Sequence, residues 1–548
     1  MHYYGHDTPD VDVTPRYSLA AWVWGHRLLE GQHWMEYLLE FLNVLAGFDY
    51  ELGQGITQGS QVPMRKERYT RYTRFGLRRF IFYDEQREKM RNDANTAAAT
   101  ALQRELENLV RVNGNQSSLV LVRTLLRSFS AVEYQRSWYA KSLFPINHEL
   151  LFWQGDRNTA KGYKQREAIA EPPVADTTVT LTKRNFYARG GEVYYLILSA
   201  GTETDLNRRH DIAHRLETLL KHSHQAVGSV ARLIDTTWER ISGNPSSLKD
   251  HGTLGWIPKP ESPLYVTIAG DVAMLLQIER DPIETLDLLA HLMGFHLTCY
   301  IYHHARPNPA DAHQPLLLID ALEGADGGVI RQFSAALFRE QEVYIVQHGQ
   351  QYVNQMVQEW AQQYGEHTAS IAYDLWAQAA SSFNLSRKTI PTWVDRLHQQ
   401  LDTGTLSRAE CVTQFGEDLF TKELRTDFDK NFVSVHRKLT KGVGFVAPKM
   451  GTGGRFVLGD TLLKALTLAN VSATQAEMPY GNFLRRLYQR YGLIVGRHEA
   501  EYAGLFDRQP LDREYYKRNA DALLEKMKRA GLAVEYSDTT AMVTIGMR

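Results

Sequence analysis

The sequence predicts a mainly α-helical protein with small β elements, an α+β fold divided into several domains. The chain has 548 residues, which is more than one hydrophobic core usually supports. Apolar residues recur at three- and four-residue spacing over long stretches, which is the pattern of amphipathic helices. Alternating and β-branched segments interrupt this pattern only locally. We expect a multidomain chain with regions 1–155, 156–440 and 441–548.

The first region reads as helical from about residue 16 to residue 155. Apolar side chains between Trp22 and Leu52 recur at helical spacing, and their aromatic members are best interpreted as a helical core. The sequence ANTAAATALQRELENLVRV predicts a second, polar-faced helix. A third helix is expected from Ser118 to Pro145, because proline is a common helix terminator.

The second region starts with a polar stretch that contains Pro172 and Pro173, as in a linker. TTVTLT and EVYYLILS then predict a β-hairpin whose tip is KRNFYARGG. Helices are expected over residues 205–241, followed by a strand, LYVTIAG. Further helices extend to about residue 438, and the short apolar run LLLID is interpreted as a buried strand.

The third region begins with KLTKGVGFVAPKMGTGGRFVLG, a glycine- and lysine-rich segment that predicts a loop or linker. Three helices follow, in FVLGDTLLKALTLAN, PYGNFLRRLYQRYGLIVG and DREYYKRNADALLEKMKRAGL. Two short alternating strands close the sequence around Ser537 and Asp538. Helices followed by a terminal hairpin are in the order of a winged helix, so we expect a winged-helix-like module here.

A basic and aromatic segment, RKERYTRYTRFGLRR, runs from Arg65 to Arg79. It holds seven basic residues and one acid in a chain whose net charge is −1. Basic side chains neutralise phosphates and aromatic rings stack on bases, so the segment predicts nucleic-acid binding, with DNA the expected partner. On a helix, residues 68, 71, 74 and 78 would share one face. The candidate binding residues are Arg68, Arg71, Arg74, Arg78 and Arg79.

A different interpretation of this segment is a solvated helical face that pairs with Asp84, Glu85 and Glu88. Three other basic groups are further candidates for nucleic-acid binding. The expected hairpin tip carries Lys183, Arg184 and Arg189, the glycine-rich loop carries Lys441 and Lys449, and the recognition position of the winged helix carries Arg513, Lys517 and Arg518. Because that last helix also carries acids, a protein-binding role is an open alternative.

No motif in the sequence specifies an enzyme. The glycine-rich loop lacks the GxxxxGK[ST] spacing of a nucleotide-binding loop, and GxSxG is absent. His296, Cys299 and His303 would share a helical face, but without known zinc spacing we interpret them as structural and expect neither metal nor cofactor. Glu192, Asp271 and Asp320 end or open β-like runs without forming a nuclease motif, and Asp512, Glu514 and Lys517 fall on an expected helix.

The cysteine content and the N-terminal sequence indicate the cellular compartment in which the protein is expected. Cys299 and Cys411 are the only cysteines, which excludes a disulfide scaffold and a four-cysteine zinc module and fits a reducing cytosol. The N-terminal sequence MHYYGHDTPDVDV does not resemble a secretory signal, and no apolar run approaches the length of a membrane helix. We therefore expect a cytoplasmic protein without a membrane partner.

Three short stretches resemble large accessory subunits of bacterial anti-phage defence systems. They are RSFSAVEYQRSWYAKSLFP, RNFYARGGEVYYLILS, and FLRRLYQRYGLIVG together with GLAVEYSD. The resemblance implies a cytosolic subunit of a multi-protein assembly that handles foreign DNA, beside an ATPase or nuclease subunit. With the basic segments, it leads us to expect a DNA-associated scaffold or recognition subunit whose partners supply catalysis. A metal-dependent nuclease and a pure protein–protein adaptor are the alternatives.

Overall fold

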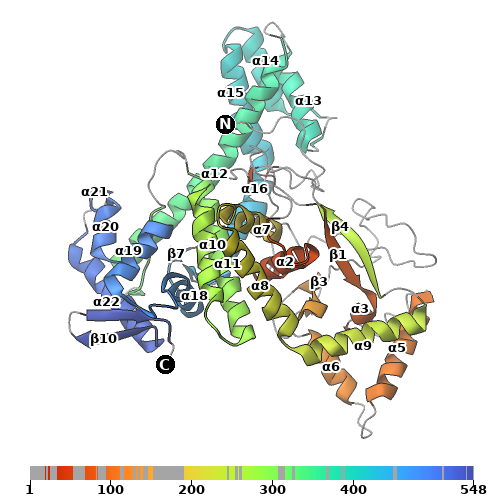
Figure 1. Ribbon diagram of the computed structural model, residues 1–548. Coiled ribbons are helices and arrows are strands. Elements are labelled where there is room, and N and C mark those ends of the chain that lie inside the picture. Colours follow the sequence, from red (N-terminus) through yellow and green to blue (C-terminus); the bar gives the residue numbers. More distant parts are fainter. Residues whose placement is uncertain are drawn as a thin grey trace. The chain divides into compact units, whose positions relative to one another are not determined.

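The structure is a computed structural model of the chain (Figure 1). It describes residues 19, 23–24, 34–53, 68–81, 83, 94–110, 117–127, 131–133, 136–139, 146–151, 190–243, 246–253, 257, 262–306, 315–323, 328–365, 370–383, 385–386, 389–448, 453–508, 511–537 and 540–546. Within these ranges the protein is mainly helical, with a few short strands, which confirms the predicted fold class.

The chain forms two compact units. We call residues 32–293 the ribbon unit and residues 1–31 together with 294–548 the long-helix unit. The boundary lies within helix α11 (Pro282–His304). The predicted division of the chain near residues 155 and 440 stays a prediction.

In the part of the chain that the structure describes, the ribbon unit consists of helices and four short strands. Its elements are α2 (Trp34–Gly47), β1 (Arg68–Arg74), α3 (Phe75–Ile81), α5 (Ala94–Val110), α6 (Ser117–Arg127), β2 (Ala131–Glu133), β3 (Arg136–Tyr139), the 3₁₀ turn η2 (His148–Leu150), α7 (Gly190–Gly201), α8 (Leu206–His222), α9 (Gln225–Ser242), β4 (Ser247–Thr253), α10 (Pro263–Leu276) and the first part of α11.

Helix α7 corrects the prediction of a β-hairpin, because EVYYLILS is helical. Nearly every residue of the helix is buried, including Glu192 and Ser199, so its sequence is mostly apolar and has no polar face to reveal the helical period. Its first residues lie very close to α2. The amide of Gly191 donates to Glu40 Oε2 at 2.6 Å, and a Cβ added at Gly190 would lie 2.2 Å from the Tyr37 ring. The glycine pair is therefore explained by helix packing.

Helix α10 corrects a second prediction, because LYVTIAG is helical as well. Ser262 caps this helix by accepting a hydrogen bond from the Leu264 amide at 3.3 Å, and Pro263 occupies the first helical position. The Ser-Pro pair before the apolar run was the helix signal. The β-branched residues that suggested a strand are instead part of a mostly buried helix.

The basic–aromatic segment is not one helix. Residues 68–74 form strand β1, which pairs antiparallel with β4, and α3 starts at Phe75. Alternation of threonine with tyrosine and arginine favours a strand when a partner is available. The helix expected from Ser118 to Pro145 is also shorter, since α6 ends at Arg127 and is followed by the paired strands β2 and β3. The expected helix after Ala94 is confirmed as α5.

The long-helix unit contains the remaining elements. They are the second part of α11, β5 (Leu317–Leu318), α12 (Val329–Gln362), α13 (Ile371–Phe383), α14 (Thr392–Asp402), α15 (Arg408–Asp418), the π-helical turn η4 (Leu419–Leu424), α16 (Arg425–Phe428), the π-helical turn η5 (Asp429–Val433), α17 (Ser434–Gly442), β6 (Val446–Ala447), β7 (Arg455–Phe456), α18 (Asp460–Asn470), β8 (Glu477–Pro479), α19 (Tyr480–Tyr491), β9 (Leu493–Ile494), α20 (Arg497–Tyr502), α21 (Leu505–Arg508), α22 (Arg513–Arg529), β10 (Ala533–Ser537) and β11 (Thr540–Thr544).

Helix α12 packs against the helical segment formed by α15, η4, α16, η5 and α17 (Figure 1). Small residues allow the two to approach closely. A Cβ at Gly349 would lie 2.6 Å from the Phe428 ring, and one at Gly416 would lie 2.7 Å from Asn354 Oδ1. The core continues through stacked rings, since Phe432 lies 4.6 Å from Trp24, centroid to centroid.

The glycine- and lysine-rich segment is not simply a linker. It starts in α17, and β6 then pairs antiparallel with β7. Phe445, Val446 and Phe456 are buried. The apolar run LLLID is confirmed as a buried strand, β5, which pairs in parallel with β9.

The C-terminal elements follow the predicted order of helices and a terminal hairpin. Strands β10 and β11 form the hairpin, and β8 pairs with β11 to give the sheet order β10-β11-β8. Gly492 ends α19 in the left-handed conformation, at φ 76°. Asn519, in α22, is fully buried and donates to the carbonyls of Ile319 and Val495 at 2.8 and 2.9 Å. It thereby fixes α22 to the ends of β5 and β9.

Candidate nucleic-acid interface

The central feature of the candidate interface is the two-stranded ribbon of β1 and β4 (Figure 1). Arg68 pairs with Thr253 and Arg74 with Ser247, so the two strands are in register over their whole length. Residues directly opposite in an antiparallel pair share a face, and faces alternate along each strand. The register therefore assigns each residue of the two strands to one of two faces.

One face of the ribbon combines cations from two distant segments. By register it holds Arg68, Tyr72, Lys249 and His251, and Arg74 belongs to the same face at the end of the ribbon, where it bonds to Asp235 and Glu149. Lys249 and His251 were not recognised from the sequence, because SLKDHGT lies in a glycine-, proline- and serine-rich stretch without a strand pattern. On the opposite face Arg71 is paired with Asp250, a register that suits a cross-strand ion pair.

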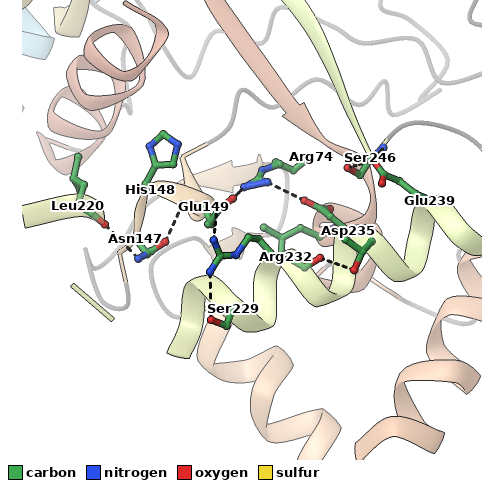
Figure 2. Close-up of polar contacts among 12 residues, drawn as sticks. Arg74, Asn147, His148, Glu149, Leu220, Ser229, Arg232, Asp235, Glu239 and Ser246 are labelled. Carbon is green, nitrogen blue, oxygen red and sulfur yellow. Dashed lines mark hydrogen bonds and ion pairs between the residues drawn. The ribbon is translucent and has the colours of Figure 1, made fainter. Parts of the chain in front are cut away.

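The base of the ribbon is held by a polar network around Arg74 (Figure 2). Arg74 Nη1 donates to Asp235 Oδ2, in α9, at 3.1 Å, and Nη2 donates to Glu149 Oε2. The Arg74 side chain is 15% exposed. This arginine therefore joins the strand to the helical body, while Asp84, Glu85 and Glu88 lie outside the described residues.

Asp235 also fixes the start of α3. Its Oδ1 accepts the Leu77 amide at 2.8 Å, an amide in the first turn of that helix, which has no partner within the helix. Burial raises the pKa of Asp235 to about 6, although Arg74 and the Leu77 amide favour the charged form. A Cβ at Gly76 would lie 2.6 Å from the Trp238 Cβ, so the turn from β1 to α3 packs tightly on α9.

Glu149 and Asn147 extend the network around Arg74 (Figure 2). The second carboxylate oxygen of Glu149 lies 3.8 Å from Arg232 Nη1. Asn147 donates to the Ser223 carbonyl at 2.6 Å and accepts from the Glu149 amide at 3.0 Å, and its side chain is buried. All of these contacts are internal, so the network is a structural support for the ribbon.

His148 occupies the same turn and contacts Tyr50. Its Nδ1 lies 2.7 Å from Tyr50 Oη, and Lys221 Nζ lies 5.1 Å from the centre of the tyrosine ring. Burial, assisted by Lys221 and Arg74, lowers the pKa of His148, which favours the neutral imidazole. Tyr50 has φ 63°, a left-handed conformation that is unusual for a bulky residue, and its hydrogen bond helps to hold it there.

The C-terminal elements give a second, less basic surface. Lys517 and Arg518 are exposed on α22, and Arg513 is 57% exposed. Arg513 is close to an acid, with Glu501 Oε1 3.8 Å from Nη2, and its guanidinium lies 5.6 Å from the Phe506 ring centre. Farther along α22, Lys528 is paired with acids of α22 and of the hairpin. The mixed charge of this surface is consistent with either partner class, protein or nucleic acid.

Several candidate residues lie elsewhere. Arg78 and Arg79 are in α3. Lys441, at the end of α17, is 9% exposed and therefore presents little surface to a polyanion. The remaining candidates, Lys183, Arg184, Arg189 and Lys449, lie outside the described residues, as does the expected strand TTVTLT.

The acids and histidines considered for chemistry are mostly parts of the core. Glu192 and Asp271 are buried on helices α7 and α10, not on strands as a nuclease centre would require, and His296 and Cys299 are buried in α11. Among the described residues, no three His, Cys, Asp or Glu side chains are grouped to hold a metal ion. Within the same residues, no helix is both long and apolar enough for a membrane crossing.

Comparisons with known proteins add no assignment, since no protein-family model, no curated protein and no solved structure matches this chain.

Proposed function

We propose that this protein is a nucleic-acid-associated scaffold or recognition subunit that binds the phosphate backbone through the β1–β4 ribbon. The observation that carries the proposal is the ribbon register, which collects Arg68, Tyr72, Lys249 and His251 on one face. A two-stranded ribbon fits the major groove of DNA, and its basic residues neutralise phosphates. DNA is the expected partner.

The internal partners of the β1 arginines limit how many of them can contact phosphate groups. Arg74 is bonded to Asp235 and Glu149, so it is not a free cation of the kind that binds phosphate, and Arg71 is in register with an acid, Asp250. Arg68 is in register with Thr253 and Lys249 with Tyr72, so neither has an acid directly opposite. The proposal therefore assigns backbone contact mainly to these two residues, with Tyr72 able to stack on a base.

The C-terminal elements support a module that joins the subunit to partners. Their order and the sheet order β10-β11-β8 are compatible with a winged helix. Because acids and bases alternate on α22, we assign this module to protein contact first and to nucleic acid second. The resemblance to accessory subunits of anti-phage defence systems supports a cytoplasmic assembly in which other subunits carry out catalysis.

The test is a salt-dependent binding experiment with charge-reversal variants. An Arg68→Glu, Lys249→Glu double variant should bind duplex DNA at least about tenfold more weakly at moderate salt, which is about 1.4 kcal/mol. The plot of log binding constant against log salt concentration should become shallower, by the amount expected for the loss of about two phosphate contacts. The matched control is Arg104→Glu, Arg208→Glu, which makes the same charge change on α5 and α8 of the same unit.

Each result distinguishes one alternative. If both double variants bind duplex DNA with the affinity and the salt dependence of the parent, the proposal of binding through the ribbon is wrong. Absence of nucleic-acid binding, combined with capture of a protein partner, would favour the adaptor alternative. Magnesium-dependent cleavage of DNA by the chain alone would favour the nuclease. Circular dichroism must first show that both variants fold like the parent.

A further inference from the structure

We propose that Asp320, Arg331 and Arg455 in the long-helix unit form a binding site for a phosphate group. We call these three residues the Asp320 cluster. Asp320 follows β5, Arg331 lies in the first turn of α12, and Arg455 opens β7. The proposal is independent of the ribbon, which belongs to the other unit.

The carboxylate of Asp320 organises the two guanidinium groups. Its Oδ2 accepts from Arg455 Nε at 2.6 Å and lies 3.6 Å from Arg331 Nε. The Asp320 side chain is completely buried, while Arg455 is 15% and Arg331 44% exposed. Two cations face one anion, so the cluster carries a net positive charge and favours an anionic ligand.

Two members of the Asp320 cluster, Asp320 and Arg455, have polar atoms that are not used in hydrogen bonds within the cluster. Asp320 Oδ1 is buried and accepts no hydrogen bond from the residues that the structure describes. Within those residues, Arg455 makes its hydrogen bond through Nε, which leaves its two Nη groups for a further acceptor. A buried carboxylate oxygen without a donor is unfavourable, so a ligand that donates to it would gain affinity.

The backbone around Asp320 is held firmly, as a recognition site requires. The Asp320 amide donates to the Phe456 carbonyl at 2.8 Å, and the Phe456 amide donates to Ser334 Oγ, in α12, at 2.9 Å. Asn519 completes the support, because its Oδ1 accepts the Ala321 amide at 2.9 Å. Strands β5 and β7 and helix α12 therefore fix the three charged side chains relative to one another.

The approach to Arg455 contains open space. A Cβ added at Gly453 would meet no atom within 4 Å, whereas a Cβ at the neighbouring Gly454 would lie 2.4 Å from the Phe338 ring. Gly454 is thus required by packing on α12. Gly453, two residues from Arg455, is therefore an open position of the chain.

These groups together match a phosphate monoester or inorganic phosphate. Guanidinium groups bind phosphate oxygens in paired, charge-assisted hydrogen bonds. The O–H of a protonated phosphate, or a hydroxyl next to the phosphate, can donate to Asp320 Oδ1. Free phosphate, a mononucleotide and the terminal phosphate of a nucleic acid share this chemistry, so the experiment must separate these sources.

The experiment is calorimetric titration of the full chain at low salt with inorganic phosphate, dAMP, deoxyadenosine and an oligonucleotide with and without a 5′-phosphate. Phosphate or dAMP should bind and deoxyadenosine should not. Arg331→Gln should weaken binding at least tenfold. The control is Arg339→Gln, the same change at another exposed position of α12, which should bind like the parent. Thermal unfolding without ligand must show that both variants fold, because Arg331→Gln also removes the hydrogen bond that Arg331 Nη2 donates to the Glu323 carbonyl.

The oligonucleotide arm identifies the source. Titration in the Arg68→Glu, Lys249→Glu background removes the ribbon contribution. If the oligonucleotide with a 5′-phosphate still binds more tightly in this background than the one without it, and Arg331→Gln abolishes that difference, the ligand is a nucleic-acid terminus. If only dAMP or inorganic phosphate binds, the ligand is a free phosphate compound. The proposal is overturned if no phosphate compound binds, if deoxyadenosine binds as well as dAMP, or if Arg331→Gln and Arg339→Gln bind equally. Because the ribbon variants leave this site intact, failure here is separate from failure of DNA binding.

Discussion

The Arg74 network and the Asp320 cluster use the same residue types with different outcomes. Around Asp235 both carboxylate oxygens are occupied, Oδ1 by the Leu77 amide and Oδ2 by Arg74. Around Asp320 only Oδ2 has partners, although the carboxylate is buried more completely. A buried carboxylate whose acceptors are all used is structural, whereas one with an unused oxygen between two arginines has capacity for a ligand.

The comparison predicts the largest stability loss at Asp235. Asp235→Ala removes the acceptor for the Leu77 amide and leaves Arg74 with Glu149 alone. Breaking a buried pair of this kind costs about 3–5 kcal/mol, measured by urea unfolding. The control Asp211→Ala, which removes an acid from a half-exposed pair with Arg215, should cost less than about 1 kcal/mol.

A loss at Asp235 no larger than the loss at Asp211 would show that the Arg74 network does not hold the ribbon unit together. Amide hydrogen exchange gives a local measurement of the same effect. Exchange at Leu77 should accelerate in Asp235→Ala and stay unchanged in Asp211→Ala, because Leu77 is bonded directly to Asp235.

The second prediction concerns pH. The pKa of Asp235 is about 6 in the folded protein, above its ordinary value of 3.8. A raised pKa means that the folded state binds the proton more tightly, so this contribution to stability is fully present below pH 3.8 and is lost as the pH rises through about 6. The unfolding free energy of the parent, relative to Asp235→Asn, should fall by up to about 3 kcal/mol between pH 4 and pH 7.

The measurement is urea unfolding of both proteins across this pH range. The difference between them isolates Asp235, since other titrating groups contribute to both. A difference that rises with pH would mean that Arg74 dominates over burial and that the carboxylate is ionised throughout. The network would then be an ordinary stabilising ion pair.

The elements that the sequence predicted well have a strong helical period and a clear end. Helix α19 is an example, because its buried Phe483, Leu484 and Leu487 lie on one face and Gly492 ends it. The apolar runs that became α7 and α10 could not be separated from strands by periodicity. They are surrounded by other helices and therefore have little or no polar face.

The candidate sites were less predictable, because their partners are distant in sequence. Arg74 and Asp235 are 161 positions apart, and the register of β1 with β4 depends on a segment without a strand pattern. Asp320 was noticed for its local surroundings, but its contact with Arg455, 135 positions away, is visible only in the fold. Composition indicates that charges are present, and tertiary structure decides which of them are already neutralised.

The smallest predicted effects come from glycine substitutions that compare the packing at the two sites. Gly76→Ala, beside Asp235, should destabilise the protein by about 1–3 kcal/mol, because the new methyl group would lie 2.6 Å from the Trp238 Cβ and 3.0 Å from Asp235 Oδ1. Gly453→Ala, near Arg455, meets no atom within 4 Å and should change stability by less than about 0.5 kcal/mol. If Gly453 lies beside a phosphate-binding site, the added methyl group should weaken phosphate binding while leaving the melting temperature unchanged. Equal destabilisation by both substitutions would mean that the Asp320 cluster is packed as closely as the Arg74 network, and the distinction drawn between the two would not hold.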